Sequence, residues 1–136
     1  MSRGISWRQR TMLESIAFNS TFSRSAWGRK PAKKPVEEPV PWRELDHGPG
    51  GEDNYFTARG AWNREQTVRR ALRSLERRGL VTLDRYVFSF HGDDWCCLEP
   101  DRHIPGDTRI MTGALLTEAG WAVVRAAAAA PQERAG

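Results

Sequence analysis

The chain has 136 residues, of which 39% are hydrophobic and 28% charged, a composition typical of one ordinary globular domain. Its apolar runs are shorter than the roughly 20 residues that a membrane-spanning helix needs. Its first residues lack the apolar core of a signal peptide, so we expect a cytoplasmic protein. The adjacent cysteines, Cys96 and Cys97, are poorly placed to form a disulfide with each other, which fits a reducing compartment.

The formal charge of +4 is unevenly distributed. Residues 1–34 carry eight Lys or Arg and one Glu, and residues 59–85 carry eight Arg and three acidic residues. The segments between and after these two basic blocks are acidic. A basic excess arranged in this way favours a polyanionic partner such as nucleic acid.

The N-terminal part of the chain predicts one helix followed by a long irregular segment. The helix covers residues 7–18, with Ser6 as its N-cap and a narrow apolar stripe on one side: Met12, Leu13, Ile16 and Ala17. A proline-rich insertion follows at about residues 20–41, because closely spaced prolines remove amide donors and disfavour helix. A short helix is expected at residues 42–46.

The strongest predicted helix covers residues 63–78. Asn63 is a good N-cap, and Gln66 lies where a capping-box partner belongs. Gly79 follows at the position of a left-handed C-cap residue. One side of this helix is apolar at i, i+3, i+4 and i+7: Val68, Ala71, Leu72 and Leu75.

The rest of the chain predicts three strands and a last helix. The strands are expected at residues 80–90, 95–98 and 109–116. The apolar alternation changes parity at Asp84-Arg85, which predicts a β-bulge or bend there. The last helix begins after Thr117 and ends near residue 130, and residues 131–136 are expected to be a flexible tail.

The outward side of the helix at 63–78 is rich in arginine and amide side chains. A helical wheel places Gln66, Arg70, Arg73 and Arg77 opposite the apolar stripe, with Asn63, Thr67, Arg69 and Ser74 on its flanks. Arginine is the preferred bidentate partner of guanine, and Gln or Asn that of adenine. The alternative is a solvated helix surface whose arginines serve only solubility, with Arg73 paired to Glu76.

Two motifs resemble parts of winged helix-turn-helix regulators of the MarR-like and related families. The segment from Gln66 to Val81 ends in the pattern Leu, two residues, Leu, three residues, Gly-Leu-Val. The segment Leu116-Thr117-Glu118-Ala119-Gly120 matches the Leu-Thr-x-x-Gly that closes the wing and opens the next helix. The motifs span about 30 residues, and their order extends the resemblance to residues 59–125.

The resemblance implies an α+β fold: a winged helix-turn-helix with a three-helix core, an enlarged β wing and a C-terminal helix, in one domain over residues 1–130. It implies double-stranded DNA as the partner, with the helix in the major groove and the wing on the minor groove or backbone. The expected DNA-binding residues are Asn63, Arg64, Gln66, Thr67, Arg69, Arg70, Arg73 and Arg77 of the helix, and Arg85 and Arg109 of the wing. The chain departs from the family in its proline-rich insertion, in the faint helix before residue 63, and in the extra wing residues 92–108.

Other sites have less support in the sequence. His91, Cys96, Cys97 and His103 lack the paired spacing of common structural zinc sites. The acidic residues between 93 and 107 fall in predicted turns and favour a solvated loop over a nuclease site. We therefore expect no catalytic residues, no metal and no cofactor.

The function predicted from these features is a sequence-specific transcriptional regulator, a repressor acting as a homodimer. One recognition helix reads only a few base pairs, and two-fold symmetry over a palindrome is the usual remedy. The expected dimer contacts are the helices at 7–18 and 117–130; alternatively, Trp121 and Val124 close the monomer's own core. Alternative functions are an accessory DNA-binding protein of plasmid or phage replication or partition, and a winged helix that binds another protein.

Overall fold

The protein has an α+β fold of three helices and a small antiparallel sheet. The computed structural model describes residues 4–23, 32–34, 36–42, 45, 58–91, 94–97 and 108–129. Its helices are α1 (Trp7–Thr21), α2 (Ala58–Arg77) and α3 (Glu118–Ala129). The main sheet has the order β3 (Val40–Pro41), β6 (Thr108–Leu116), β4 (Val81–His91) and β5 (Asp94–Cys97), and β1 (Phe22–Ser23) pairs with β2 (Ala32–Lys33) in a second sheet.

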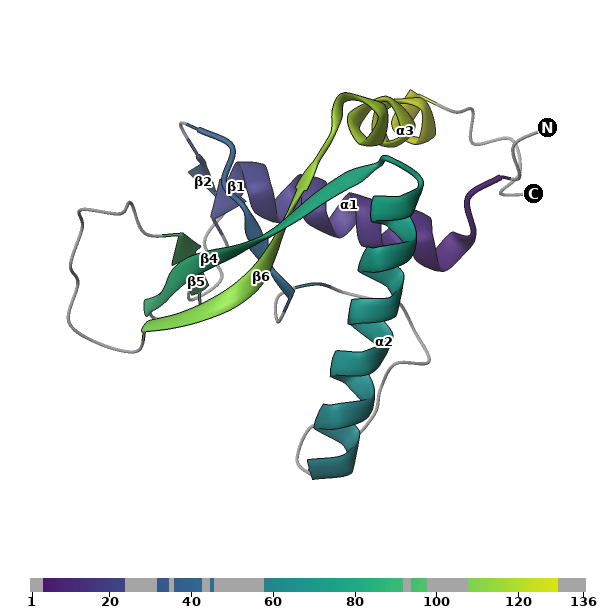
Figure 1. Cartoon of the computed structure of the whole chain (residues 1–136). Coiled ribbons are helices and arrows are strands. Elements are labelled where there is room, and N and C mark those ends of the chain that lie inside the picture. Colours follow the sequence, from purple (N-terminus) through teal and green to yellow (C-terminus); the bar gives the residue numbers. More distant parts are fainter. Residues whose placement is uncertain are drawn as a thin grey trace.

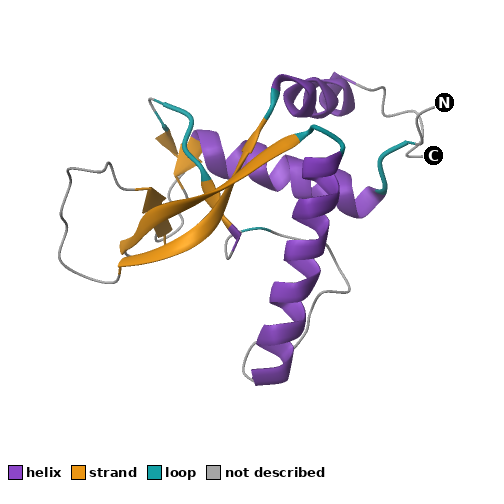
Figure 2. Cartoon of the chain, viewed as in Figure 1, coloured by secondary structure: helices purple, strands orange, loops and turns teal. Residues whose placement is uncertain are grey.

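The elements meet at the C-terminal end of α2 (Figures 1 and 2). Helix α2 and the long antiparallel pair of β4 and β6 both cross in front of α1, and α3 lies at the end of this pair where β6 finishes. We call this β4–β6 pair the hairpin, although β5 lies between its strands in the sequence. The N-terminal half of α2 projects away from this junction, and the other end of the hairpin extends away on the side of β5. Helix α2 and the hairpin therefore diverge from a common base.

The apolar stripes expected from the sequence form the core. Helix α1 contributes Met12, Leu13, Ile16 and Ala17, and α2 contributes Val68, Leu72 and Leu75, all of which are buried. Ser6 accepts a hydrogen bond from the Gln9 backbone at 3.2 Å, and the Gln9 side chain accepts one from the Ser6 backbone, which makes a capping box at the start of α1. Both helix orientations predicted from the sequence are confirmed.

A left-handed glycine ends α2 and directs the chain into β4. Gly79 has φ 74°, its N–H donates to the Glu76 carbonyl, and the Leu80 N–H donates to the Leu75 carbonyl at 3.0 Å. These two bonds form a Schellman motif, and Leu80 and Leu75 are both buried in the core, as this motif favours. The predicted C-cap is confirmed.

Gly79→Ala tests this turn. A Cβ at residue 79 meets no atom within 4 Å, so the expected cost comes from the left-handed backbone alone. We expect the free energy of unfolding to fall by about 1–2 kcal/mol, measured by urea denaturation. A gain in stability would show that the turn does not need positive φ, and Gly4→Ala, in open space before α1, serves as the matched control.

The segments that carry the two sequence motifs, around Gly79 and around Thr117, are joined by hydrogen bonds at this turn. Thr117 donates its hydroxyl to the Gly79 carbonyl at 2.6 Å, and its N–H donates to the Leu80 carbonyl at 3.1 Å. The same hydroxyl accepts from the Gly120 N–H at 3.1 Å and so caps α3, as predicted for Thr117. Gly120 is buried against the Leu80 carbonyl, where a Cβ would overlap the oxygen. Two segments about 40 residues apart therefore form one junction between α2, the hairpin and α3.

The bulge at Asp84-Arg85, which the sequence predicted as one of two possibilities beside a bend, does not occur. Strands β4 and β6 keep one register from Val81 opposite Leu116 to Ser89 opposite Thr108. The apolar parity changes because the hairpin buries opposite faces at its two ends: Val81 packs in the core, whereas Phe88 is buried on the other face. Gly113 makes room for this second cluster, since a Cβ there would lie 2.8 Å from the Tyr86 ring and 2.9 Å from the Phe88 ring.

Other boundaries also differ from those expected. Helix α1 continues to Thr21, and the insertion at about 20–41 contributes the short strands β1, β2 and β3 rather than only loop. Val40 of β3 is buried opposite Ala114 of β6, and Pro41 follows it in this edge strand, where proline is tolerated. At the expected short helix over 42–46, the Leu45 N–H donates to the Trp42 carbonyl; residues 43–44 and 46–57, and the predicted tail at 131–136, lie outside the described residues.

Candidate nucleic-acid interface

The outward side of α2 carries a row of exposed arginines. Arg70, Arg73 and Arg77 are exposed and lie opposite the buried stripe of Val68, Leu72 and Leu75. Within the part of the chain that the structure describes, none of these three guanidinium groups has an ion pair. Glu76 is exposed, and the alternative pairing of Arg73 with Glu76 does not occur among the described side chains. The row is therefore an unneutralised positive surface on a rigid helix.

The flank of this row is partly occupied by contacts within the protein. Arg69 forms an ion pair with Glu65 at 3.0 Å, an i, i+4 pair on the helix surface. Its Nε is buried, with no hydrogen-bond partner among the described residues. Gln66 and Thr67 are half-buried rather than exposed. Of the predicted residues in this part of the helix, the three exposed arginines of the row are thus the most available to a ligand.

Asn63 does not cap the helix, so this prediction is wrong. Helix α2 begins at Ala58, which places Asn63 and Arg64 inside the helix, more than a turn from its start. The misreading has a local cause, since an Asn followed three residues later by Gln looks like a cap wherever it stands. The side chains of Asn63 and Arg64 lie outside the described residues.

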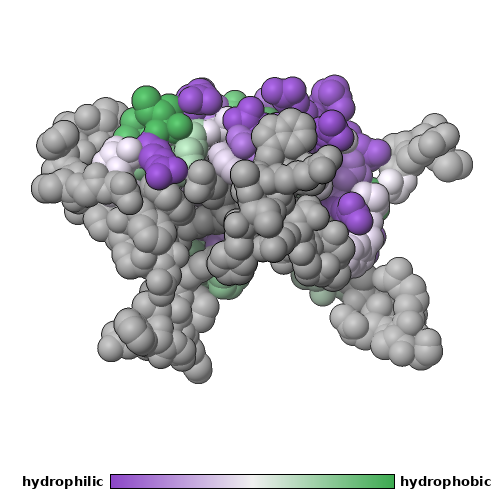
Figure 3. Space-filling model, turned by 90° about the horizontal axis from the view of Figure 1, so that it is seen from below, coloured by the Kyte–Doolittle hydropathy of each residue, from purple (hydrophilic) through white to green (hydrophobic). Residues whose placement is uncertain are grey.

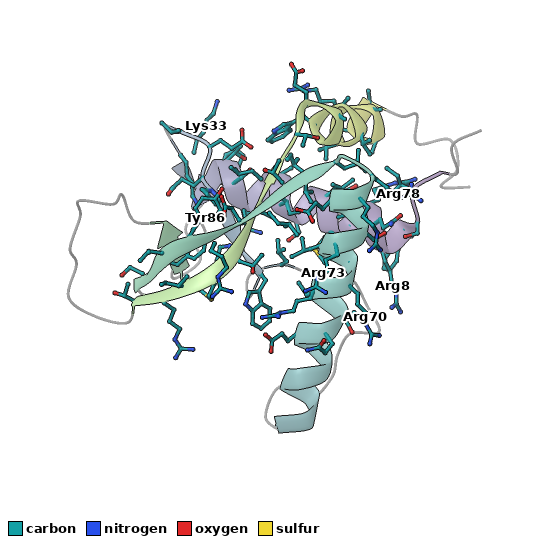
Figure 4. The ribbon with its side chains drawn as sticks, in the orientation of Figure 1. Arg8, Lys33, Arg70, Arg73, Arg78 and Tyr86 are labelled. Carbon is teal, nitrogen blue, oxygen red and sulfur yellow. The ribbon has the colours of Figure 1, made fainter. Side chains whose placement is uncertain are left out.

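A cation from α1 adds to this surface. The Gln9 side chain donates to the Ser74 hydroxyl at 3.0 Å, which brings the first turn of α1 against α2. Figure 4 shows Arg8 on the same side of α2 as Arg70 and Arg78, while Arg73 points toward the side of the hairpin. Arg8 was not predicted, because its position depends on a contact between residues 65 apart. The sequence carried no signal for Arg8 beyond its place in the first turn of the predicted helix.

The two arginines expected in the wing lie on opposite faces of the hairpin. Both are exposed, but Arg85 pairs with Thr112 and Arg109 with Phe88, so their side chains start from opposite sides of the sheet. Beside Arg85, on the same face, Val87 and Ile110 form a cross-strand pair that remains 40% and 62% exposed. A ligand that lies flat on one face of the hairpin therefore does not contact both arginines equally.

The face seen from below in Figure 3 separates hydrophobic from hydrophilic surface. Hydrophobic surface gathers on the side on which the hairpin extends away from the core in Figure 1, and hydrophilic surface gathers on the side of α2. This division agrees with the exposed Val87 and Ile110 at one place and the exposed arginines of α2 at the other.

Comparison of the chain with protein-family models, with curated proteins and with solved structures finds no match. Among the described residues, no helix is long and apolar enough to cross a membrane. No group of three or more His, Cys, Asp or Glu side chains in the described ranges is placed to hold a metal ion. The exposed arginines of α2 therefore remain the candidate site among the described residues.

Helix α3 packs its apolar side against the protein's own core. Trp121 and Val124 are half-buried there, in the arrangement that the alternative to an α3 dimer contact predicts. The Trp121 indole donates to Glu37 at 3.3 Å, and the Arg125 guanidinium lies 5.7 Å from the centre of the same ring system. These contacts on both sides of Trp121 leave mainly exposed alanines on the outer side of α3.

Proposed function

We propose that the protein is a winged-helix DNA-binding protein that reads double-stranded DNA with α2 and regulates transcription as a homodimer, as a repressor. The observation that carries the proposal is the exposed row of Arg70, Arg73 and Arg77, which has no ion pair among the described side chains. A helix of this kind fits the major groove, and arginines on it supply both phosphate contacts and bidentate contacts to guanine. The proposal places the protein in the cytoplasm, together with its DNA.

The arrangement of α2 and the hairpin supports this function. Helix α2 is 20 residues long, and its N-terminal half projects from the core, as Figure 1 shows. A projecting helix can enter a groove about 12 Å wide without collision of the rest of the protein with the DNA backbone. The hairpin that follows α2 diverges from it, as a wing would, and carries the exposed residues Arg85 and Arg109 on its opposite faces.

The first test is the selection of a binding sequence from a random DNA library with the purified protein, followed by a salt titration on the selected site. We expect log K to fall with log salt concentration, with a slope of about 0.9 per phosphate contact. A winged helix that binds another protein predicts no selected sequence and little salt dependence. That outcome would contradict the proposal.

The second test removes the arginines that face outward from α2. We expect Arg70→Ala and Arg73→Ala each to weaken binding to the selected site by about 1–3 kcal/mol and to relax its base preference. The fold should be unaffected, because exposed substitutions change stability by about 0.5 kcal/mol or less. The matched control is Arg125→Ala, which removes the same charge from α3; equal affinity of both α2 variants and wild type would show that α2 does not read DNA.

A further inference from the structure

The side of α1 that faces away from the core carries a stripe with an exposed aromatic residue at each end. Trp7 and Phe18 are 54% and 42% exposed, and they lie opposite the buried stripe of Met12 and Ile16. Phe18 stacks on Phe22, with ring centroids 5.4 Å apart, so the exposed aromatic surface extends beyond the end of the helix. The contiguous aromatic surface of Phe18 and Phe22 is therefore a candidate interaction site.

The residues of this stripe follow heptad spacing. Trp7, Thr11, Glu14 and Phe18 are separated by four, three and four positions, as in the a and d seam of a coiled coil. The pattern is symmetric about the midpoint between residues 12 and 13. If a second copy of the helix lies antiparallel on the first, Trp7 of each copy meets Phe18 of the other, and Thr11 meets Glu14.

Glu14 of the stripe and Arg10 beside it carry complementary charges in this same register. Arg10 lies one position from the level of Glu14 of the second copy, on the same flank of the stripe. Both residues are exposed, and among the described side chains neither takes part in an ion pair, although they are four positions apart in one helix. Two-fold symmetry then forms the Arg10–Glu14 contact twice. The Thr11 hydroxyl already donates to the Trp7 carbonyl at 2.9 Å, so the contact leaves it satisfied.

We propose that the outward stripe of α1, formed by Trp7, Thr11, Glu14 and Phe18, is the dimer interface, and that its occupant is the same stripe of a second copy in antiparallel orientation. This inference rests on the proposed function in one respect, since it names the contact that joins two DNA-reading subunits. It also replaces the expected contact through α3, whose Trp121 and Val124 pack on the protein's own core.

The resulting geometry suits two recognition helices. Antiparallel helices that contact face to face are related by an axis perpendicular to both the helices and the line between them. In Figure 1, α1 lies across the view behind α2 and the hairpin, so its outward stripe faces away from the viewer and this axis runs roughly along α2. Both α2 helices then project to the same side of the dimer, as binding to one face of a palindrome requires.

The test uses two charge reversals and needs no DNA. We expect wild-type protein at micromolar concentration to sediment at twice 15.4 kDa. Arg10→Glu brings carboxylates together at both Arg10–Glu14 contacts, near the middle of the interface, and Glu14→Arg brings guanidinium groups together there, so each variant alone is expected at the monomer mass. An equimolar mixture of the two should form a heterodimer, detected by native mass spectrometry, because both contacts become attractive again.

This rescue cannot come from changes within one helix, since each chain keeps its own like-charged pair. The matched control, Arg8→Glu, reverses a charge on the same helix away from the stripe and should remain dimeric. Trp7→Ala removes an exposed side chain from the interface and is expected to be monomeric, with an unchanged circular dichroism spectrum. Wild type at the monomer mass, a dimer that survives Trp7→Ala, or a mixture without heterodimer would each overturn the proposal.

The outcomes separate this inference from the proposed function. A monomer that selects a DNA sequence would overturn the interface and leave DNA binding intact. A dimer broken by these substitutions that selects no DNA would leave the interface intact and contradict the proposed function.

Discussion

Leu75→Ala is expected to lower the free energy of unfolding by about 2–5 kcal/mol. The Leu75 side chain is fully buried in the core cluster to which α1, α2 and the hairpin contribute, and it belongs to the Schellman motif with Leu80. The truncation removes apolar contacts and leaves a cavity next to the turn that joins α2 to β4. The measurement is urea denaturation followed by circular dichroism and tryptophan fluorescence.

The neighbouring Glu76→Ala is the control for this prediction. Glu76 is exposed on the same helix turn, so its truncation should change stability by about 0.5 kcal/mol or less. If Leu75→Ala were as stable as this control, the stripe of Val68, Leu72 and Leu75 would face solvent. The arginine row would then face the core, and the proposed DNA-reading side of α2 would be the wrong one.

Gly120→Ala is expected to destabilise the protein by about 1–3 kcal/mol, the usual cost of overpacking. Residue 120 lies within α3, where helix propensity alone favours alanine over glycine by about 1 kcal/mol. The structure predicts the opposite sign, because the added Cβ would overlap the Leu80 carbonyl oxygen and lie 3.2 Å from the Leu116 side chain. The Leu80 carbonyl is held by the Thr117 N–H and cannot easily move.

Thermal and urea unfolding of Gly120→Ala decide between these signs. Gly4→Ala, which adds a methyl group in open space, is expected to leave the unfolding midpoint unchanged. A gain in stability at residue 120 would show that α3 does not approach the turn at Leu80 closely. The close packing of α3 on the turn at Leu80, which joins the segments around Gly79 and Thr117, would then be wrong.

Features with short-range causes were predictable from the sequence. The buried stripes of α1 and α2 follow from helical spacing, and the ends at Ser6, Gly79 and Thr117 follow from local hydrogen-bond chemistry. The same reasoning placed Arg70, Arg73 and Arg77 on the outward side of α2, because a helix with one apolar stripe has only one opposite side. Asn63 shows the limit of such signals, since a cap-like pair inside a longer helix looks the same as a true cap.

Contacts between distant segments were decided only by the tertiary structure. The hairpin keeps one register and buries Val81 and Phe88 on opposite faces, because different parts of the protein cover its two ends. The Gln9–Ser74 hydrogen bond brings Arg8 beside α2, and no local pattern contains that distance. Helix α1 also carries Trp7 and Phe18 on the side opposite its buried stripe, and the sequence alone does not say whether another part of the chain covers them. Packing of α1 against β6, α3 and α2 buries Met12 and Ile16 and leaves Trp7 and Phe18 exposed on the other side.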